Sequence, residues 1–238
     1  MVMRYKYVVF LIFIIVLIIL IGNLILNFDG IYRTNINVYK KLKSSNYIIH
    51  IEVDNKILYL MDKDTKEIIA KYIVATGKAS SPTPLGIFEV IDMGRWGEGF
   101  GSRWIGLNVP WGRYGIHGTN KPGLIGFNAS AGCVRMRNSD VEDLYDKVNI
   151  GTKVILTNGP YGPFAYGYRD LRPGDRGADV LEVQKRLFIL GYYDDSLDGI
   201  YGERMKSALI NYLKDNSMDL TDTITEDIYQ SLGILLIE

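Results

Sequence analysis

Residues 130–136 read Ser130-Ala131-Gly132-Cys133-Val134-Arg135-Met136 and contain the only cysteine in a chain of 238 residues. Sixteen positions before that cysteine stands one of the two histidines, in the stretch Gly115-Ile116-His117-Gly118-Thr119. A lone cysteine is more often a small buried hydrophobic residue. Here, however, glycines flank both side chains, and glycine permits tight turns that bring a substrate close to the backbone. The pattern therefore indicates a nucleophilic thiol, Cys133, with His117 as its base.

The expected chemistry is the attack of a thiolate on an amide carbonyl. An unperturbed thiol is mostly protonated at neutral pH, so we expect the imidazole of His117 to take the proton of Cys133. The attack creates an oxyanion, for which the backbone N–H groups of Gly132, Cys133 and Gly118 are candidate donors. No acidic residue stands beside His117. A backbone carbonyl or a hydroxyl is therefore expected to orient its second ring nitrogen.

Together, the two stretches resemble the L,D-transpeptidase catalytic domain of the YkuD type. The resemblance continues upstream, where Thr76-Gly77 and Thr83-Pro84-Leu85-Gly86-Ile87-Phe88 look like the strand and turn signature of this family, and it covers residues 46–158. It implies that Cys133 attacks a tetrapeptide stem of peptidoglycan, releases D-alanine and forms a thioester. The side-chain amine of a second stem then resolves the thioester into a 3→3 crosslink. The implied partners are the donor and acceptor stem peptides, with no cofactor and no metal.

Four further residues are expected to contact the substrate. They are Arg135, Ser130, Thr119 and Tyr114. Two roles stay open for Arg135, a bidentate hydrogen bond to a stem carboxylate or a structural salt bridge. One position departs from the family pattern, because many relatives carry a histidine where this chain has Ala131. We expect His117 to suffice, since one imidazole can serve as base toward the thiol and as acid toward the leaving amine.

Two other functions stay open beside crosslinking. Water could resolve the thioester, which would make the same site an L,D-carboxypeptidase. Alternatively, the first domain could have decayed, leaving a non-catalytic protein that binds the cell wall. The intact residues His117, Gly132, Cys133 and Arg135 argue against decay. Nothing in the sequence separates an amine from water as the acceptor.

The pattern of residues 46–158 predicts a mostly β domain. Apolar residues alternate from Tyr47 onward, with Ile49 and Ile51 on one face, and His50 between them is expected to be structural. Other β-rich runs lie at 57–61, 68–75, 86–90 and 152–157. One helix is expected over 139–148, where Ser139 and Glu142 are spaced as a capping box. With the resemblance, this predicts an α+β fold whose catalytic domain is a β-sandwich with one helix.

The segment from 94 to 112 shows no periodicity and is rich in glycine and tryptophan. It is expected to form a structured surface loop beside the substrate. Trp104 and Trp111 either line the groove or pack in the core.

The amino-terminal residues predict a membrane anchor. Residues 7–26 carry no charge, and a helix of twenty residues matches a hydrocarbon core of about 30 Å. A secretory signal peptide is the alternative, because Arg4 and Lys6 are basic, but no Ala-x-Ala cleavage site follows. We therefore expect a signal anchor over 1–28 and a spacer over 29–45. The protein would cross the cell membrane once, with its catalytic domain outside the cytoplasm and facing the wall.

The carboxyl-terminal residues have a different signature. After a Gly- and Pro-rich linker at 159–168, residues 169–238 resemble a small three-helix peptidoglycan-binding domain. The family's usual Phe-Gln at the end of the second helix appears here as Tyr212-Leu213. This segment has eight basic and fourteen acidic residues, a net charge of −6, which argues against nucleic acid. It is expected to bind wall glycan or peptide and to fold independently.

Overall fold

The computed structural model describes residues 46–95, 97 and 99–237. No helix in this part of the chain has the length and apolarity needed to cross a membrane. The predicted signal anchor at 1–28, with its apolar residues 7–26, and the spacer at 29–45 lie outside the described residues. The anchor therefore stays a prediction.

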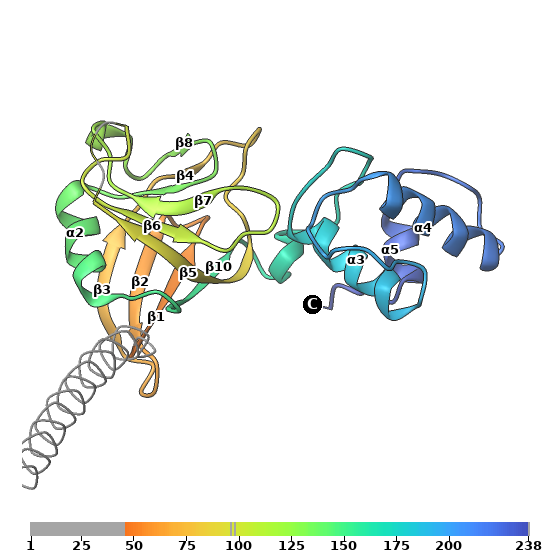
Figure 1. Ribbon diagram of the computed structural model, residues 1–238, viewed down its shortest axis with the longest axis horizontal. Helices are drawn as coiled ribbons and strands as arrows, with labels where there is room; N and C mark the ends of the chain where they lie inside the picture. The colour runs from red at the N-terminus through yellow and green to blue at the C-terminus, as the bar shows by residue number, and fades with distance from the viewer. Residues whose placement is uncertain (1–45, 96, 98, 238) are drawn as a thin grey trace, which may run out of the picture. The chain divides into compact units, whose positions relative to one another are not determined.

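The first domain is mostly β and is built on one eight-stranded sheet (Figure 1). The strand order is β3-β2-β1-β10-β5-β6-β7-β9. These strands are β1 (Tyr47–Glu52), β2 (Ile57–Asp62), β3 (Ile68–Ile73), β5 (Gly86–Gly94), β6 (Trp104–Leu107), β7 (Tyr114–His117), β9 (Val134–Arg135) and β10 (Lys153–Thr157). Within this sheet, β1 and β10 are parallel, as are β7 and β9. A separate parallel pair consists of β4 (Thr76–Gly77) and β8 (Asn128–Ser130).

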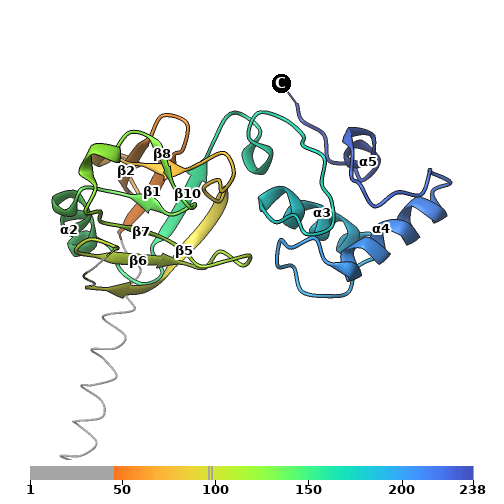
Figure 2. The ribbon, with the colours of Figure 1, turned by 90° about the horizontal axis from the view of Figure 1, so that it is seen from above.

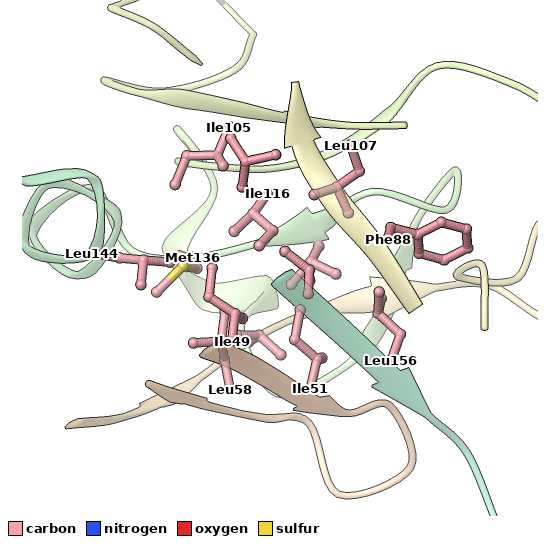
Figure 3. Packing of buried hydrophobic residues seen from close by; sticks show 14 of the residues in the cluster. Ile49, Ile51, Leu58, Phe88, Ile105, Leu107, Ile116, Met136, Leu144 and Leu156 are labelled. Carbon is pink, nitrogen blue, oxygen red and sulfur yellow. The ribbon is translucent and has the colours of Figure 1, made fainter. Parts of the chain in front are cut away.

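The core lies against one face of this sheet, in a half-barrel rather than the predicted sandwich of two sheets. Strand β10 is the reason, because it pairs with β1 on one side and with β5 on the other. It thereby joins the hairpins on either side of it into one sheet, whose natural twist lets it curve around a single core. Side chains from both ends of the sheet point into this shared interior (Figure 3), among them Ile49, Leu58, Ile105 and Ile116.

Helix α2 (Asn138–Lys147) packs on the core through Val141 and Leu144, which are fully buried. It begins one residue earlier than predicted, and no side chain caps its amino-terminal end. The predicted capping box is therefore not formed. Its first residue, Asn138, instead accepts a hydrogen bond from the backbone N–H of Ser102 at 3.2 Å.

The segment from 94 to 112 differs from the predicted surface loop. It contains strand β6, all of whose residues are buried. Trp104 is 2% exposed and Trp111 is 5% exposed, so both tryptophans pack in the interior. The strand escaped the sequence pattern because it is short and buried on both faces, which removes the alternation that reveals a strand.

Three helices follow the first domain and enclose a second core (Figure 2). They are α3 (Ala178–Ile189), α4 (Glu203–Asp215) and α5 (Glu226–Ser231). Buried Gln184 on α3 fixes the loop between α3 and α4. Its amide nitrogen donates to Asp198 Oδ1 at 2.9 Å and to the Ile200 carbonyl at 3.0 Å, while its oxygen accepts from the Gly199 N–H at 2.7 Å.

The predicted linker at 159–168 is an ordered connection. It contains a short 3-10 helix, η2 (Gly162–Phe164), and Phe164 is buried in the second core. The hydroxyl of Tyr166 donates to Asp54 Oδ2 of the first domain at 2.9 Å. Ala178, Leu181 and Ile200 of the C-terminal module, residues 169–238, pack against the first core. The two domains therefore share apolar contacts, whereas the sequence predicted independent units.

Candidate active site

Strands β7 and β9 bring the histidine and cysteine stretches side by side. His117 lies opposite Arg135 in their parallel register, and Ile116 lies opposite Val134. Cys133 directly precedes β9. Because successive side chains point to opposite faces of a sheet, Cys133 projects to the same face as Arg135 and therefore to the same face as His117. The register places the thiol and the imidazole as diagonal neighbours.

His117 is 3% exposed and sits in an aromatic cage. Trp104 stacks on its ring, with centroids 5.9 Å apart, and Phe100 meets it edge-on at 5.0 Å. Nδ1 lies 2.6 Å from the carbonyl oxygen of Gly118. A carbonyl can only accept, so Nδ1 carries the proton and Nε2 is the nitrogen able to take another. A backbone carbonyl therefore orients the ring, as the sequence predicted.

Burial also sets the protonation state of His117. It lowers the pKa of the imidazole, although the carbonyls of Gly118 and Phe100 favour the protonated ring. The positive charge of Arg135 lowers this pKa further. The imidazole is therefore neutral near pH 7, which is the state that a general base requires.

Cys133 is half-buried, and burial raises the pKa of its thiol. A backbone hydrogen bond from Gly115 and the charge of Arg135 oppose this rise. A hydrogen bond that lowers the pKa of a thiol must stabilise the thiolate, so it is the Gly115 N–H that donates to the sulfur. Because burial is the largest of the three effects, the resting thiol is protonated and needs a base.

The three predicted oxyanion donors differ in their hydrogen bonding. The N–H of Gly118 donates to the Arg103 carbonyl at 3.1 Å, within the pairing of β6 and β7. The N–H of Gly132 donates to Ser130 Oγ at 3.0 Å. The N–H of Cys133 has no acceptor among the residues that the structure describes. The N–H groups of Gly118 and Gly132 are therefore engaged within the protein, whereas that of Cys133 is not, and the oxyanion donors stay a prediction.

Ser130 and Thr119, two of the predicted substrate contacts, are buried and hydrogen-bonded within the protein. Ser130 is 1% exposed, and its hydroxyl donates to the Cys133 carbonyl at 2.6 Å. The Ser130 hydroxyl also accepts the hydrogen bond from the Gly132 N–H, and these two bonds stabilise the turn that carries the thiol. Thr119 is 7% exposed, and its hydroxyl accepts from the N–H of Lys121 at 3.0 Å. Both hydroxyls therefore hold turns in shape instead of facing the solvent.

Arg135 and Tyr114 lie beside the thiol. Arg135 donates weakly to the carbonyl of Ala129 at 3.4 Å, and no carboxylate among the described residues forms a salt bridge with it. Its charge acts on both Cys133 and His117. The Tyr114 ring packs so closely on Gly132 that a Cβ at Gly132 would lie 2.6 Å from Cε1. Gly132 also has φ +114°, a backbone conformation that favours glycine.

Sequence reasoning missed three contributors: Gly115, Phe100 and Asn138. Asn138 Oδ1 holds the Ser102 N–H, and it fills the space where a Cβ at Gly101 or Gly118 would lie, at 2.2 Å in each case. It thus fixes the loop that carries Phe100 against the other face of the histidine stretch. No local signal identifies these residues, because their roles depend on contacts between distant segments. Within the described ranges, no group of three or more His, Cys, Asp or Glu side chains could hold a metal ion.

Comparison with known proteins identifies two families in the chain. Residues 46–156 match the YkuD model, described as the L,D-transpeptidase catalytic domain, and residues 176–224 match a peptidoglycan-binding domain. YqjB of Bacillus subtilis, named as an L,D-transpeptidase, is 34% identical over 133 residues, which are 49% of this chain and 74% of that protein. YkuD of Bacillus licheniformis, named likewise, is 38% identical over 112 residues, which are 47% of this chain and 66% of that protein. The chain thus covers just under two thirds of the second relative.

Proposed function

Because the chain belongs to the L,D-transpeptidase family, we propose that it crosslinks peptidoglycan stems by acyl transfer through a thioester on Cys133. The donor is a tetrapeptide stem, the acceptor is the side-chain amine of a second stem, and the product is a 3→3 crosslink. One observation carries the proposal. A half-buried thiol lies on the strand beside that of a buried, neutral imidazole, and its own backbone N–H has no acceptor within the described part of the chain.

In the first step, the proton of the Cys133 thiol passes to Nε2 of His117 while sulfur bonds to the stem carbonyl carbon. The carbonyl electrons move to oxygen, and the N–H of Cys133 stabilises the resulting oxyanion. When the C–N bond breaks, His117 returns its proton to the nitrogen of the departing D-alanine. The acyl group remains on sulfur as a thioester.

In the second step, the side-chain amine of another stem attacks the thioester carbonyl. His117 takes a proton from this amine, the C–S bond breaks with its electron pair on sulfur, and His117 gives that proton to the sulfur, which restores the thiol of Cys133. The energy of the original amide is conserved in the thioester, so no nucleotide is consumed. Exclusion of water by Trp104 and Phe100 around His117 keeps the imidazole neutral between the two steps.

The test is to incubate the full-length protein with a purified disaccharide tetrapeptide and to weigh the products. A dimer lighter than two monomers by one D-alanine supports crosslinking. A disaccharide tripeptide with free D-alanine would identify a carboxypeptidase instead, because water would then be the acceptor. Unchanged substrate together with retention on isolated wall would favour a non-catalytic wall-binding protein. Cys133→Ala is the control, and product formation by that variant would refute the role of the thiol.

We also propose that residues 7–26 anchor the protein in the cell membrane, with the catalytic domain outside the cytoplasm. The support is the uncharged length of this segment and the basic residues before it. The C-terminal module would then hold the enzyme on wall glycan or peptide. Intact-mass analysis of the membrane fraction should find residues 1–28 retained. A mature chain that begins beyond them would show that the segment is a cleaved signal peptide.

A further inference from the structure

A cleft with a volume of about 1150 Å³ lies between the first domain and the C-terminal module. Its walls come from the 77–85 loop, from Trp111 and Tyr114, and from residues 163–169 and 174–179. This volume is slightly above the range for small-molecule sites, about 300–1,000 Å³. The cleft therefore has room for a ligand of the size of a short peptide.

The cleft adjoins the nucleophile. Tyr114 lines it, and the ring of Tyr114 packs on Gly132, the residue before Cys133. Pro82 lines it as well, and its carbonyl oxygen would lie 3.2 Å from a Cβ at Gly132. On the same loop, the N–H of Lys78 donates to the Ser130 carbonyl at 3.0 Å. Cys133 itself does not line the cleft. Tyr114 and Pro82 connect the cleft to the turn that precedes the thiol.

The acidic side chains of the cleft are already engaged. Asp54 accepts from the hydroxyl of Tyr166 at 2.9 Å. Asp179 accepts from Arg169 at 2.6 and 3.2 Å, and Asp175 accepts from the N–H of Arg172 at 2.7 Å. All three carboxylates thus have hydrogen-bond donors within the protein, and Arg169 forms ion pairs with Asp179 and Asp175.

Two cations that line the cleft have no such partner. Among the residues that the structure describes, no ion pair involves Arg176 or Lys78. Both side chains are exposed. Burial raises the pKa of Tyr114, while the charge of Arg176 lowers it and that of Cys133 raises it, so Tyr114 lies within electrostatic reach of both groups. Arg176 and Lys78 therefore give the cleft positive charge that no described carboxylate pairs, on the side of the cleft that Tyr114 links to the nucleophile's turn.

The backbone of Arg176 is held rigidly against the first domain. Arg176 forms a β-bridge with Ile200, which packs on the first core. Gly199 approaches Trp111 so closely that a Cβ there would lie 2.5 Å from the ring. The N–H of Gly177 donates to the Gly199 carbonyl at 3.0 Å. The contact between the two domains thus fixes the backbone position from which the Arg176 side chain extends.

Building on the proposed function, we propose that this cleft binds the part of the peptidoglycan stem that bears its carboxylates, and that Arg176 selects for a carboxylate there. A guanidinium suits this role because its planar donors match the two carboxylate oxygens. The C-terminal module is then part of the substrate site, as well as a means of retention on the wall.

The test measures binding without turnover. Full-length protein carrying Cys133→Ala is titrated by calorimetry with a disaccharide tetrapeptide and with an analogue whose stem carboxylates are carboxamides. Adding Arg176→Gln should weaken binding of the tetrapeptide about tenfold, the scale of one lost charge-assisted hydrogen bond. Binding of the carboxamide analogue should change less than about twofold. Arg172→Gln, which removes an exposed arginine outside the cleft, is the matched control and should bind both peptides as its parent does.

Two outcomes would overturn the inference. Equal affinity for the tetrapeptide with and without Arg176→Gln would show that the guanidinium does not bind it. An equal loss of affinity for both peptides would show that Arg176 stabilises the cleft without recognising a carboxylate. Because binding is measured on the Cys133→Ala protein, the result does not depend on which acceptor the enzyme uses or on whether it turns over. Failure of crosslinking by the unmodified protein would refute the proposed function separately.

Discussion

Substitution of His117 by alanine tests whether this imidazole is the base for Cys133. Two further ionisable groups are coupled electrostatically to Cys133: Arg135, which is a cation, and Tyr114, whose hydroxyl has a raised pKa and stays protonated. Neither can accept a proton at neutral pH. Without the imidazole, only the fraction of Cys133 that is already thiolate can react.

The size of the loss follows from the burial of the thiol. A thiol with an ordinary pKa of about 8.5 is about 3% thiolate at pH 7. Burial raises the pKa of Cys133, so its thiolate fraction is smaller still. Loss of a positioned proton-transfer group typically costs 10²–10⁴-fold. We therefore expect His117→Ala to slow acylation at pH 7 about 10²-fold or more.

The two proteins should also differ in how their acylation rates depend on pH. In the unmodified protein, burial lowers the pKa of His117, so the base stays active down to a pH below the usual titration range of histidine. In His117→Ala, the rate should rise about tenfold per pH unit until the raised pKa of Cys133 is reached. The two proteins should therefore converge at alkaline pH.

The assay follows acylation by a carbapenem, whose strained lactam carbonyl should trap the thiolate as a stable adduct, using intact mass at a series of pH values. His50→Ala is the matched control, because His50 lies on β1 and its Nε2 contacts Thr157 Oγ1 at 3.0 Å. That variant should acylate at the rate of the unmodified protein. Near-normal acylation of His117→Ala at pH 7 would refute the assignment and require another base.

Three more outcomes are expected. Cys133→Ala should form no carbapenem adduct, and an adduct on that variant would place the nucleophile elsewhere. Ala131→His should change the acylation rate by less than about threefold, because residue 131 is exposed and surface substitutions usually act within about 0.5 kcal/mol. A large gain in rate would show that a second histidine is needed. Asn138→Ala should lower stability by about 1–3 kcal/mol because it leaves the Ser102 N–H unpaired, and it should slow acylation by loosening the loop beside His117. Thermal unfolding and acylation rates check this, with Asn138→Asp, which keeps an acceptor oxygen, expected to lose less.

The structure changes one expectation about the two domains. Their separate signatures predicted units that work independently, so removal of 169–238 would affect only retention on the wall. The contacts of Ala178, Leu181 and Ile200 with the first core, and the shared cleft, indicate that its removal also exposes apolar surface and removes one wall of the cleft.

The sequence by itself indicated the family of this protein and the type of most of its elements. The stretch around Cys133 and the stretch around His117 are local, and their residue types indicate a thiol and a base without knowledge of the fold. The helices of the C-terminal module show their 3.6-residue period in the chain. Alternation likewise revealed β1 at Tyr47–Glu52, because one face of that strand is buried and the other is not.

The tertiary structure decided what depends on pairing between distant segments. Strand β10 joins residues 48–52 to residues 86–89, which turns the expected sandwich into one curved sheet. At the other end of the sheet, where β6, β7 and β9 are neighbours, the Gly118 N–H donates to the Arg103 carbonyl, and the Cys133 N–H has no acceptor among the described residues. Register is set by packing of the whole core and not by the residues that pair. For that reason, neither these donors nor the position of Arg176 in the cleft could be inferred from the sequence.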